Sequence, residues 1–183
     1  MLKLEDFQAA KKRVDEVILP THLIHSEAFS EESGNDVYIK PENLQKTGAF
    51  KIRGAYNKIM KLDDEAKKKG LIASSAGNHA QGVAYAAKKL GVKATICMPA
   101  HTPLIKVDAT KAHGADVVLY GEAYDEAYEK AVELQKSEGY TFVHPFDDED
   151  VIAGQGTIGL EILDQLPDVE AVVVPVGGGG LIS

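Results

Sequence analysis

The stretch "LIASSAGNHAQG", Leu71 to Gly82, decides the fold. Its first residues are an apolar run that predicts a short buried strand, and small and polar residues then lead into helical spacing from Asn78. A strand followed at once by a helix is half of a βαβ unit, from which parallel sheets are built. The neighbouring sequence should therefore show the same alternation.

The alternation continues on both sides of this stretch. An N-terminal helical segment is followed by the strand pattern "DVYIK" and by a helix from Lys51 to Leu62. Downstream, strands are expected in "KATICMP", "ADVVLYG", "YTFVHPF" and the strongly apolar "VEAVVVPV", and helices at 78–90, in "TPLIKVDATKAHG", at 122–138 and in "DEDVIAGQGTIGLEILDQL". This order predicts an α/β fold with parallel sheets covered by helices on both faces.

Composition narrows the function classes. The chain has 183 residues, 44% of them hydrophobic, with no apolar run long enough to span a membrane and no signal-peptide pattern. Its net charge of -8 disfavours nucleic acid and anionic lipid surfaces as partners. The single cysteine, Cys97, lies in an apolar strand pattern and is expected to be buried and inert. A cytoplasmic protein acting on a small molecule is the expectation.

The loop "SSAGNHAQG", residues 74–82, is the first of three candidate binding loops. In parallel α/β sheets, ligands bind where strands end and helices begin. Small residues there let the backbone approach a ligand, the first-turn N–H groups are free to bind an anion, and Asn78 offers a donor and an acceptor. The alternative is ordinary helix capping by Ser74, Ser75 and Asn78.

The second loop is the tetraglycine that follows "VEAVVVPV". Successive glycines cost conformational entropy and have no side chains to pack, so they need a reason. Glycine permits the backbone nest in which consecutive N–H groups point at a phosphate. A flexible connector is the alternative, but connectors seldom follow a buried strand directly.

The third loop, "TGAFKIRGA", places Lys51 at the start of a helix. Helix starts disfavour cations, so the pKa of this amine should be lowered. A neutral amine is the form that reacts with an aldehyde to give a Schiff base. The alternative is a lysine on the solvated side of an amphipathic helix. An amine nucleophile, an asparagine loop and a phosphate cradle together indicate pyridoxal phosphate.

The motifs "KTGAFKIRGA", "SSAGNHAQG", "VHPFDD", "GQGTIGLEI" and "VPVGGGGL" resemble those of the threonine ammonia-lyase (threonine dehydratase) family over essentially the whole chain. The resemblance implies a tryptophan-synthase-β-like fold (fold type II) and pyridoxal phosphate as cofactor. By this resemblance Lys51 would bind the cofactor covalently, Phe50 would pack on its ring and Asn78 would contact its phenolic oxygen. It further implies phosphate binding by Gly177, Gly178, Gly179 and Gly180, and binding of the substrate carboxylate by Ser75, Ala76, Gly77, Asn78 and His79.

The implied activity is α,β-elimination, which converts L-threonine to 2-oxobutanoate and ammonia, and L-serine to pyruvate. Serine racemases of this fold carry a serine immediately before the Gly-Asn of the asparagine loop, where this chain has Ala76. Elimination is therefore expected over racemisation or β-replacement. The family also implies a homo-oligomer, and no metal ligands are predicted, since His22 and His25 have no third partner.

One departure from the family concerns the end of the chain, because family members continue well beyond the glycine loop. The resemblance implies an incomplete larger domain from residues 1–53 and 150–183, with residues 54–149 as a smaller inserted domain. Two readings stay open: an ammonia-lyase whose chemistry needs the remaining segment, or a non-catalytic folding or assembly module.

Three further features are expected to be structural. The run Gly154 to Gly159 matches the glycine spacing of a dinucleotide loop but has no acidic residue about twenty positions further on, so it predicts close helix packing. Arg53, on an amphipathic helix, is expected to be structural or interfacial. The acidic run Asp147 to Asp150 suits a solvated helix N-terminus.

Overall fold

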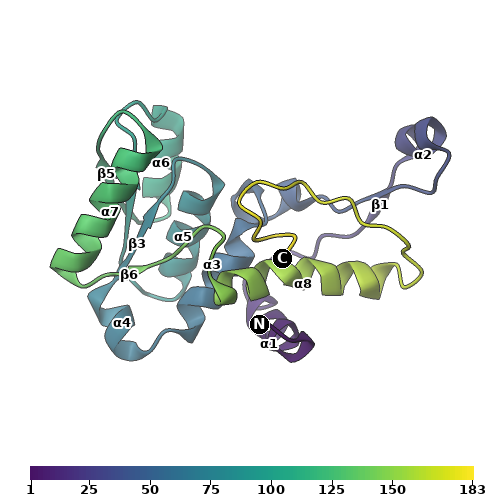
Figure 1. Ribbon diagram of the computed structural model, residues 1–183, viewed down its shortest axis with the longest axis horizontal. Helices are drawn as coiled ribbons and strands as arrows, with labels where there is room; N and C mark the ends of the chain where they lie inside the picture. Colours follow the sequence, from purple (N-terminus) through teal and green to yellow (C-terminus); the bar gives the residue numbers. More distant parts are fainter.

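The computed structural model describes residues 1–183 and contains a four-stranded parallel sheet of order β5-β4-β3-β6 (Figure 1). Its strands are β3 (Leu71–Ser74), β4 (Ala94–Met98), β5 (Asp116–Leu119) and β6 (Thr141–Phe142). The register runs from Leu71 opposite Ala94 to Ser74 opposite Cys97. The predicted parallel α/β arrangement is confirmed for this part of the chain, which we call the sheet lobe.

Helices cover both faces of this sheet. They are α4 (Asp64–Lys69), α5 (Asn78–Lys89), α6 (Leu104–Ala112) and α7 (Tyr124–Glu138). Alternate strand residues point to opposite faces. Leu71 and Ala73 join the core cluster that contains the buried alanines of α5, whereas Ile72 and Cys97 pack with Ala131 of α7.

Cys97 has the structural role that its apolar surroundings predict. Its side chain is fully buried, and burial raises the pKa of the thiol to about 11. A thiol held in its protonated form is a poor nucleophile, so Cys97 serves as a core residue.

The helix that begins at Lys51, α3 (Lys51–Lys61), lies between the sheet lobe and the rest of the chain (Figure 1). It packs on α5 on one side and on α8 (Glu149–Gln165) on the other, and α1 (Leu4–Val14) packs against both α8 and α3. The predicted domain division after residue 53 falls inside α3, and it stays a prediction.

The region before α3 is less regular than expected. The "DVYIK" strand is reduced to β2 (Tyr38–Ile39), which pairs antiparallel with β1 (Ile24–His25) and carries α2 (Glu27–Ser33) between them. Two 3-10 turns, η1 (Glu42–Leu44) and η2 (Lys46–Gly48), then lead into α3. The prediction of a parallel strand here is wrong, because the chain returns on itself after the short helix.

The predicted strand "VEAVVVPV" is absent. Residues 169–176 form no strand and pair with none, and Val173 is 96% exposed. Figure 1 shows this segment (yellow) leaving the end of α8 and turning back toward the start of α3. An apolar run becomes a strand only where a neighbour offers free N–H and C=O groups, and the four-stranded sheet lies on the far side of α3.

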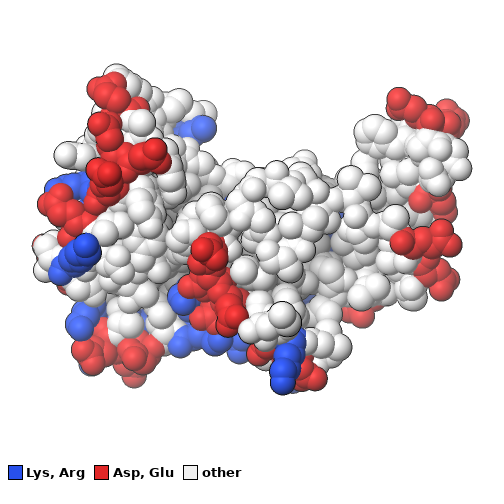
Figure 2. Space-filling model, in the orientation of Figure 1, with Lys and Arg blue, Asp and Glu red and all other residues white.

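Charge is distributed unevenly over the surface. Figure 2 shows acidic side chains gathered over α7 and α2, whereas the face over the C-terminal segment is largely uncharged. In residues 169–183 only Glu170 carries a charged side chain. None of the helices combines the length and the apolar character that crossing a membrane requires.

Candidate active site

Lys51 is the first residue of α3, and its side chain reaches across to the sheet lobe. Its Nζ donates a 2.7 Å hydrogen bond to the carbonyl oxygen of Pro145, just beyond β6. The same Nζ lies 5.4 Å from the centre of the Phe50 ring. Burial lowers the pKa of this amine. The lowered pKa has the predicted direction, and its cause is desolvation of the amine by burial.

The asparagine loop lies beside Lys51. A Cβ on Gly82 would stand 3.1 Å from the backbone carbon of Lys51, so α5 passes directly over the start of α3. The backbone N–H groups of Asn78, His79 and Ala80 have no acceptor within the chain. These free donors at a helix N-terminus form an anion site next to the lysine.

The side chain of His79 plays a different part from the one its position in the loop suggests. It is only 3% exposed, and Nε2 donates to the carbonyl oxygen of Val143 at 2.9 Å. Desolvation, with smaller contributions from Lys51 and His144, lowers the pKa of His79 to about 4. The imidazole is therefore neutral and internal, with Nδ1 as a buried acceptor that has no partner, and the backbone N–H of His79 is free for a ligand.

The tetraglycine loop packs against the residue that follows Pro145. A Cβ on Gly178 would lie 2.3 Å from Cδ1 of Phe146, and one on Gly180 would lie 2.7 Å from the Phe146 carbonyl oxygen. Gly179 has a φ of +86°, which disfavours side chains. No residue of the chain accepts a hydrogen bond from the N–H groups of residues 177–180. Gly178, Gly179 and Gly180 therefore require glycine, whereas Gly177 has open space at its Cβ position, and the N–H groups of all four residues are free for a ligand.

Lys51 and the tetraglycine loop therefore meet at the turn of Pro145 and Phe146, and the asparagine loop lies beside them, in contact with Lys51 through Gly82 and with Val143 through His79. Two buried hydroxyls close to them, Thr47 Oγ1 and Ser74 Oγ, have no hydrogen-bond partner. Thr47 also adopts a left-handed φ of 65°, four residues before the lysine. A partly desolvated amine, free backbone donors and unpartnered hydroxyls fit a phosphate-bearing aldehyde such as pyridoxal phosphate.

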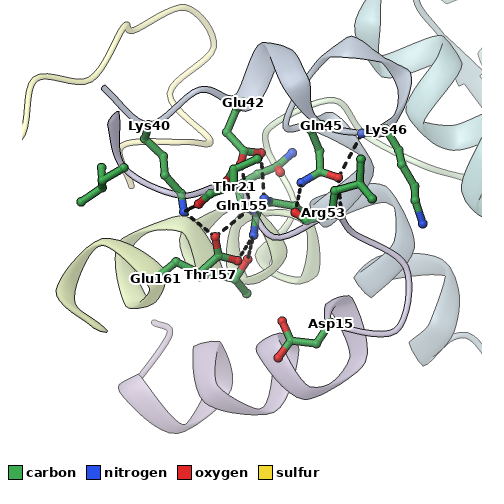
Figure 3. Close-up of polar contacts among 12 residues, drawn as sticks. Asp15, Thr21, Lys40, Glu42, Gln45, Lys46, Arg53, Gln155, Thr157 and Glu161 are labelled. Atoms are coloured by element: carbon green, nitrogen blue, oxygen red, sulfur yellow. Dashed lines mark hydrogen bonds and ion pairs between the residues drawn. The ribbon is translucent and has the colours of Figure 1, made fainter. Parts of the chain in front are cut away.

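Arg53, two residues after Lys51, anchors α3 on the side away from the sheet (Figure 3). Its side chain is fully buried and donates to both oxygens of Glu42, at 2.7 and 2.9 Å, and to both oxygens of Glu161, at 2.6 and 3.1 Å. Lys40 adds a 2.7 Å ion pair to Glu161. The structural interpretation of Arg53 is confirmed: it binds neighbouring segments, and no charge in the cluster is left unpaired.

Sequence reasoning missed two parts of this arrangement. It gave no role to Glu42 and Glu161, because their pairing with Arg53 depends on segments far apart in the chain. It also gave none to His144, Pro145 and Phe146, although "VHPFDD" was one of the family-like motifs. The acidic run that follows them is only partly solvated, since Asp148 caps α8 and pairs with Lys58 at 2.7 Å.

Comparison with known proteins places this chain in a family. The family described as "Pyridoxal-phosphate dependent enzyme" matches residues 14–183, and the chain belongs to that family. The predicted cofactor and the predicted fold type II are thereby confirmed.

Individual members of this family show which relatives the chain resembles in sequence and in structure. The chain is 58% identical over 183 residues to the L-threonine ammonia-lyase of Thermotoga maritima, covering 100% of this chain and 46% of that protein. The processed form of threonine deaminase isoform 2 from Solanum lycopersicum superimposes with a TM-score of 0.94 at 50% identity, covering 98% of this chain and 49% of that one. Maize serine racemase gives 0.95 at 36% identity, covering 98% and 55%. The chain spans about half the length of the curated relatives it matches.

Proposed function

We propose that this chain carries the cofactor lysine, the phosphate loop and the carboxylate loop of a pyridoxal-phosphate-dependent ammonia-lyase. The substrate would be L-threonine, converted to 2-oxobutanoate and ammonia, with L-serine converted to pyruvate as a second reaction. The observation that carries the proposal is the meeting of Lys51 with Pro145 and of the tetraglycine loop with Phe146. The similarity to the Thermotoga protein supports the choice of substrate.

Each predicted site residue has a place in this proposal. Lys51 would hold the cofactor, with Phe50 beside its ring and Asn78, exposed at the start of α5, facing its polar edge. The N–H groups of Gly177, Gly178, Gly179 and Gly180 would receive the phosphate. The loop Ser75, Ala76, Gly77, Asn78 and His79 would receive the substrate carboxylate at the start of α5, chiefly through the free N–H groups of Asn78 and His79, since the N–H of Ser75 already donates to the Cys97 carbonyl oxygen at 3.1 Å.

The chemistry divides between cofactor and chain. When bound, pyridoxal phosphate supplies the electron sink that lets the α-carbon lose its proton. The chain supplies the base: desolvation keeps more of Lys51 neutral than an exposed lysine, and the Pro145 carbonyl fixes the position of its Nζ. Free N–H groups at the start of α5 would orient the carboxylate. The net reaction expels the β-hydroxyl and the amine, with water supplying the oxygen of the 2-oxo acid.

Two alternative functions remain to be compared with this proposal. Serine racemases share the fold, but Ala76 offers no hydroxyl to return a proton from the face opposite Lys51. A non-catalytic folding or assembly module is the second alternative. The homo-oligomer and the cytoplasmic location rest on the family resemblance and stay predictions.

Turnover separates these functions. The purified chain is saturated with pyridoxal phosphate, given L-threonine or L-serine, and assayed for ammonia and the 2-oxo acid, with Lys51→Ala as the matched inactive variant. The proposal expects 2-oxobutanoate from threonine in the unaltered chain only. Cofactor bound to Lys51 without any 2-oxo acid would favour the assembly module.

A further inference from the structure

A single turn beyond β6 holds two parts of the cofactor site at once. Nδ1 of His144 accepts the backbone N–H of Asp147 at 2.8 Å and that of Phe146 at 3.4 Å. A ring nitrogen that accepts these bonds carries no proton, so the imidazole closes the turn as a neutral acceptor. The side chain lies half-buried, and its neighbours Pro145 and Val143 are buried.

The turn that His144 closes touches both ends of the site. Its Pro145 carbonyl accepts the hydrogen bond from Lys51 at 2.7 Å. Its Phe146 is in contact with the tetraglycine loop, through the ring at Gly178 and through the backbone at Gly180. A displacement of this turn would therefore move two groups together: the carbonyl that accepts the Lys51 hydrogen bond, and the Phe146 residue that contacts the tetraglycine loop.

The imidazole contributes a ring as well as an acceptor. Its ring lies edge-on to Phe146, with centroids 4.8 Å apart at 85°, and tilted against Phe142 at 6.4 Å and 41°. Ring packing and hydrogen bonding are separable by substitution. The acceptor is the contribution that fixes the backbone, since packing alone does not specify the direction of the two N–H groups.

We propose that His144 is a positioning residue for the cofactor site: its Nδ1 fixes the turn that supports the tetraglycine loop on Phe146 and directs the Pro145 carbonyl at Lys51. This inference rests on the proposed function, since it assigns the loop to phosphate binding. His144 itself need not touch the cofactor. Its effect passes through the backbone of residues 145–147.

Two variants separate the acceptor from the ring. His144→Phe keeps an aromatic ring and removes the acceptor. His144→Asn removes the ring and keeps an acceptor of suitable length, because Asp148 in this same chain accepts the N–H groups of Asp150 and Val151 with the same spacing. Phe146→Leu is a third variant, which removes the aromatic ring beneath Gly178 while His144 stays intact.

Affinity for two forms of the cofactor gives the first readout. Pyridoxal lacks the phosphate, so the ratio of the dissociation constants of pyridoxal and pyridoxal 5′-phosphate isolates what the glycine loop contributes. We expect the ratio to fall roughly tenfold in His144→Phe and in Phe146→Leu, and to be kept in His144→Asn. An unchanged ratio in His144→Phe, or an equal loss in His144→Asn, would overturn the inference.

The second readout needs no cofactor and therefore stands even if the proposed function fails. In the cofactor-free chain, nuclear Overhauser contacts between the Phe146 ring and the α-protons of Gly178 report the position of the loop. They should be present in the unaltered chain and in His144→Asn and be weakened in His144→Phe. Full contacts in a folded His144→Phe chain would refute the inference, whereas absence of pyridoxal phosphate binding by the unaltered chain would refute the proposed function.

Discussion

Gly154 of α8 lies in direct backbone contact with Gly54 of α3. A Cβ on Gly154 would stand 2.6 Å from the Gly54 α-carbon and 2.6 Å from the Arg53 carbonyl oxygen. The contact lets the two helices approach more closely than side chains allow, and α3 begins with Lys51. The glycine pattern that resembles a dinucleotide loop is thus a helix-packing device, as its sequence context predicts.

Gly154→Ala should therefore destabilise the chain. The added methyl group meets backbone, which cannot move aside as a side chain can, so we expect a loss of about 2 kcal/mol or more in urea unfolding. Gly159 of the same helix is the matched control, because nothing lies within 4 Å of its Cβ position. Gly159→Ala should raise stability by about 0.5–1 kcal/mol, since alanine favours the helix. Equal effects of the two substitutions would contradict the helix contact.

Arg53→Met should cost about 3–5 kcal/mol, because it leaves the partly buried Glu42 without a cationic partner and the buried Glu161 with Lys40 alone. Burial opposes the charge of Glu161, but the hydrogen bonds from Arg53 and Lys40 hold its pKa below the usual value, so the pairing dominates. Unfolding in urea measures the loss. Lys69→Gln, which breaks an exposed pair with Glu65, serves as the control and should leave stability nearly unchanged. A loss no larger than that of the control would show that the cluster does not stabilise the fold.

The lowered pKa of His79 predicts that the free energy of unfolding decreases in acid. The pKa of His79 is about 4 in the folded chain against an ordinary value of 6.5. Between these two values the unfolded chain binds a proton at His79 and the folded chain does not. Stability should fall as pH drops through this window, by up to about 3 kcal/mol near the lower end. His79→Gln can still donate to Val143 and does not titrate.

The measurement is the free energy of unfolding of both chains from about pH 7 to about pH 4.5. With acidification, the unaltered chain should steadily lose stability relative to His79→Gln. His22→Gln, at an exposed histidine, should keep the slope of the unaltered chain. Parallel curves for His79→Gln and the unaltered chain would mean that His79 is not held neutral.

Ala76→Ser tests the distinction between elimination and racemisation. A hydroxyl at this position could return a proton to the α-carbon from the face opposite Lys51, so the variant should form D-serine from L-serine while pyruvate production falls. Chiral chromatography of the reaction mixture measures both products. Pyruvate formation without any D-serine in the variant would show that Ala76 does not decide the outcome.

Local patterns predicted most of the sheet lobe. β3, α5 and β4 follow from apolar runs that alternate with helical spacing, and these elements depend mainly on neighbours close in sequence. Residues 169–176 show the limit of this reasoning. Their valines satisfy the pattern of a buried strand, but strand formation also requires a paired neighbour, and no local pattern reports whether one is present.

The candidate site shows the same limit. Residue types identified Lys51, the asparagine loop and the tetraglycine loop, because each departs from what helix or strand formation alone requires. The turn that joins them was not predictable, since the acceptor of the Lys51 amine is a backbone carbonyl 94 residues away. Likewise, the burial of the His79 imidazole depends on Val143, which lies 64 residues further along the chain.

The central claim is that Lys51 is the cofactor lysine, and one measurement tests it most directly. The chain is incubated with pyridoxal phosphate, reduced with borohydride, digested and mapped by mass spectrometry, with Lys51→Arg treated in parallel. The account predicts a single modified lysine at position 51 and no specific modification in the variant. Modification spread over surface lysines, or a specific label at another lysine, would contradict it.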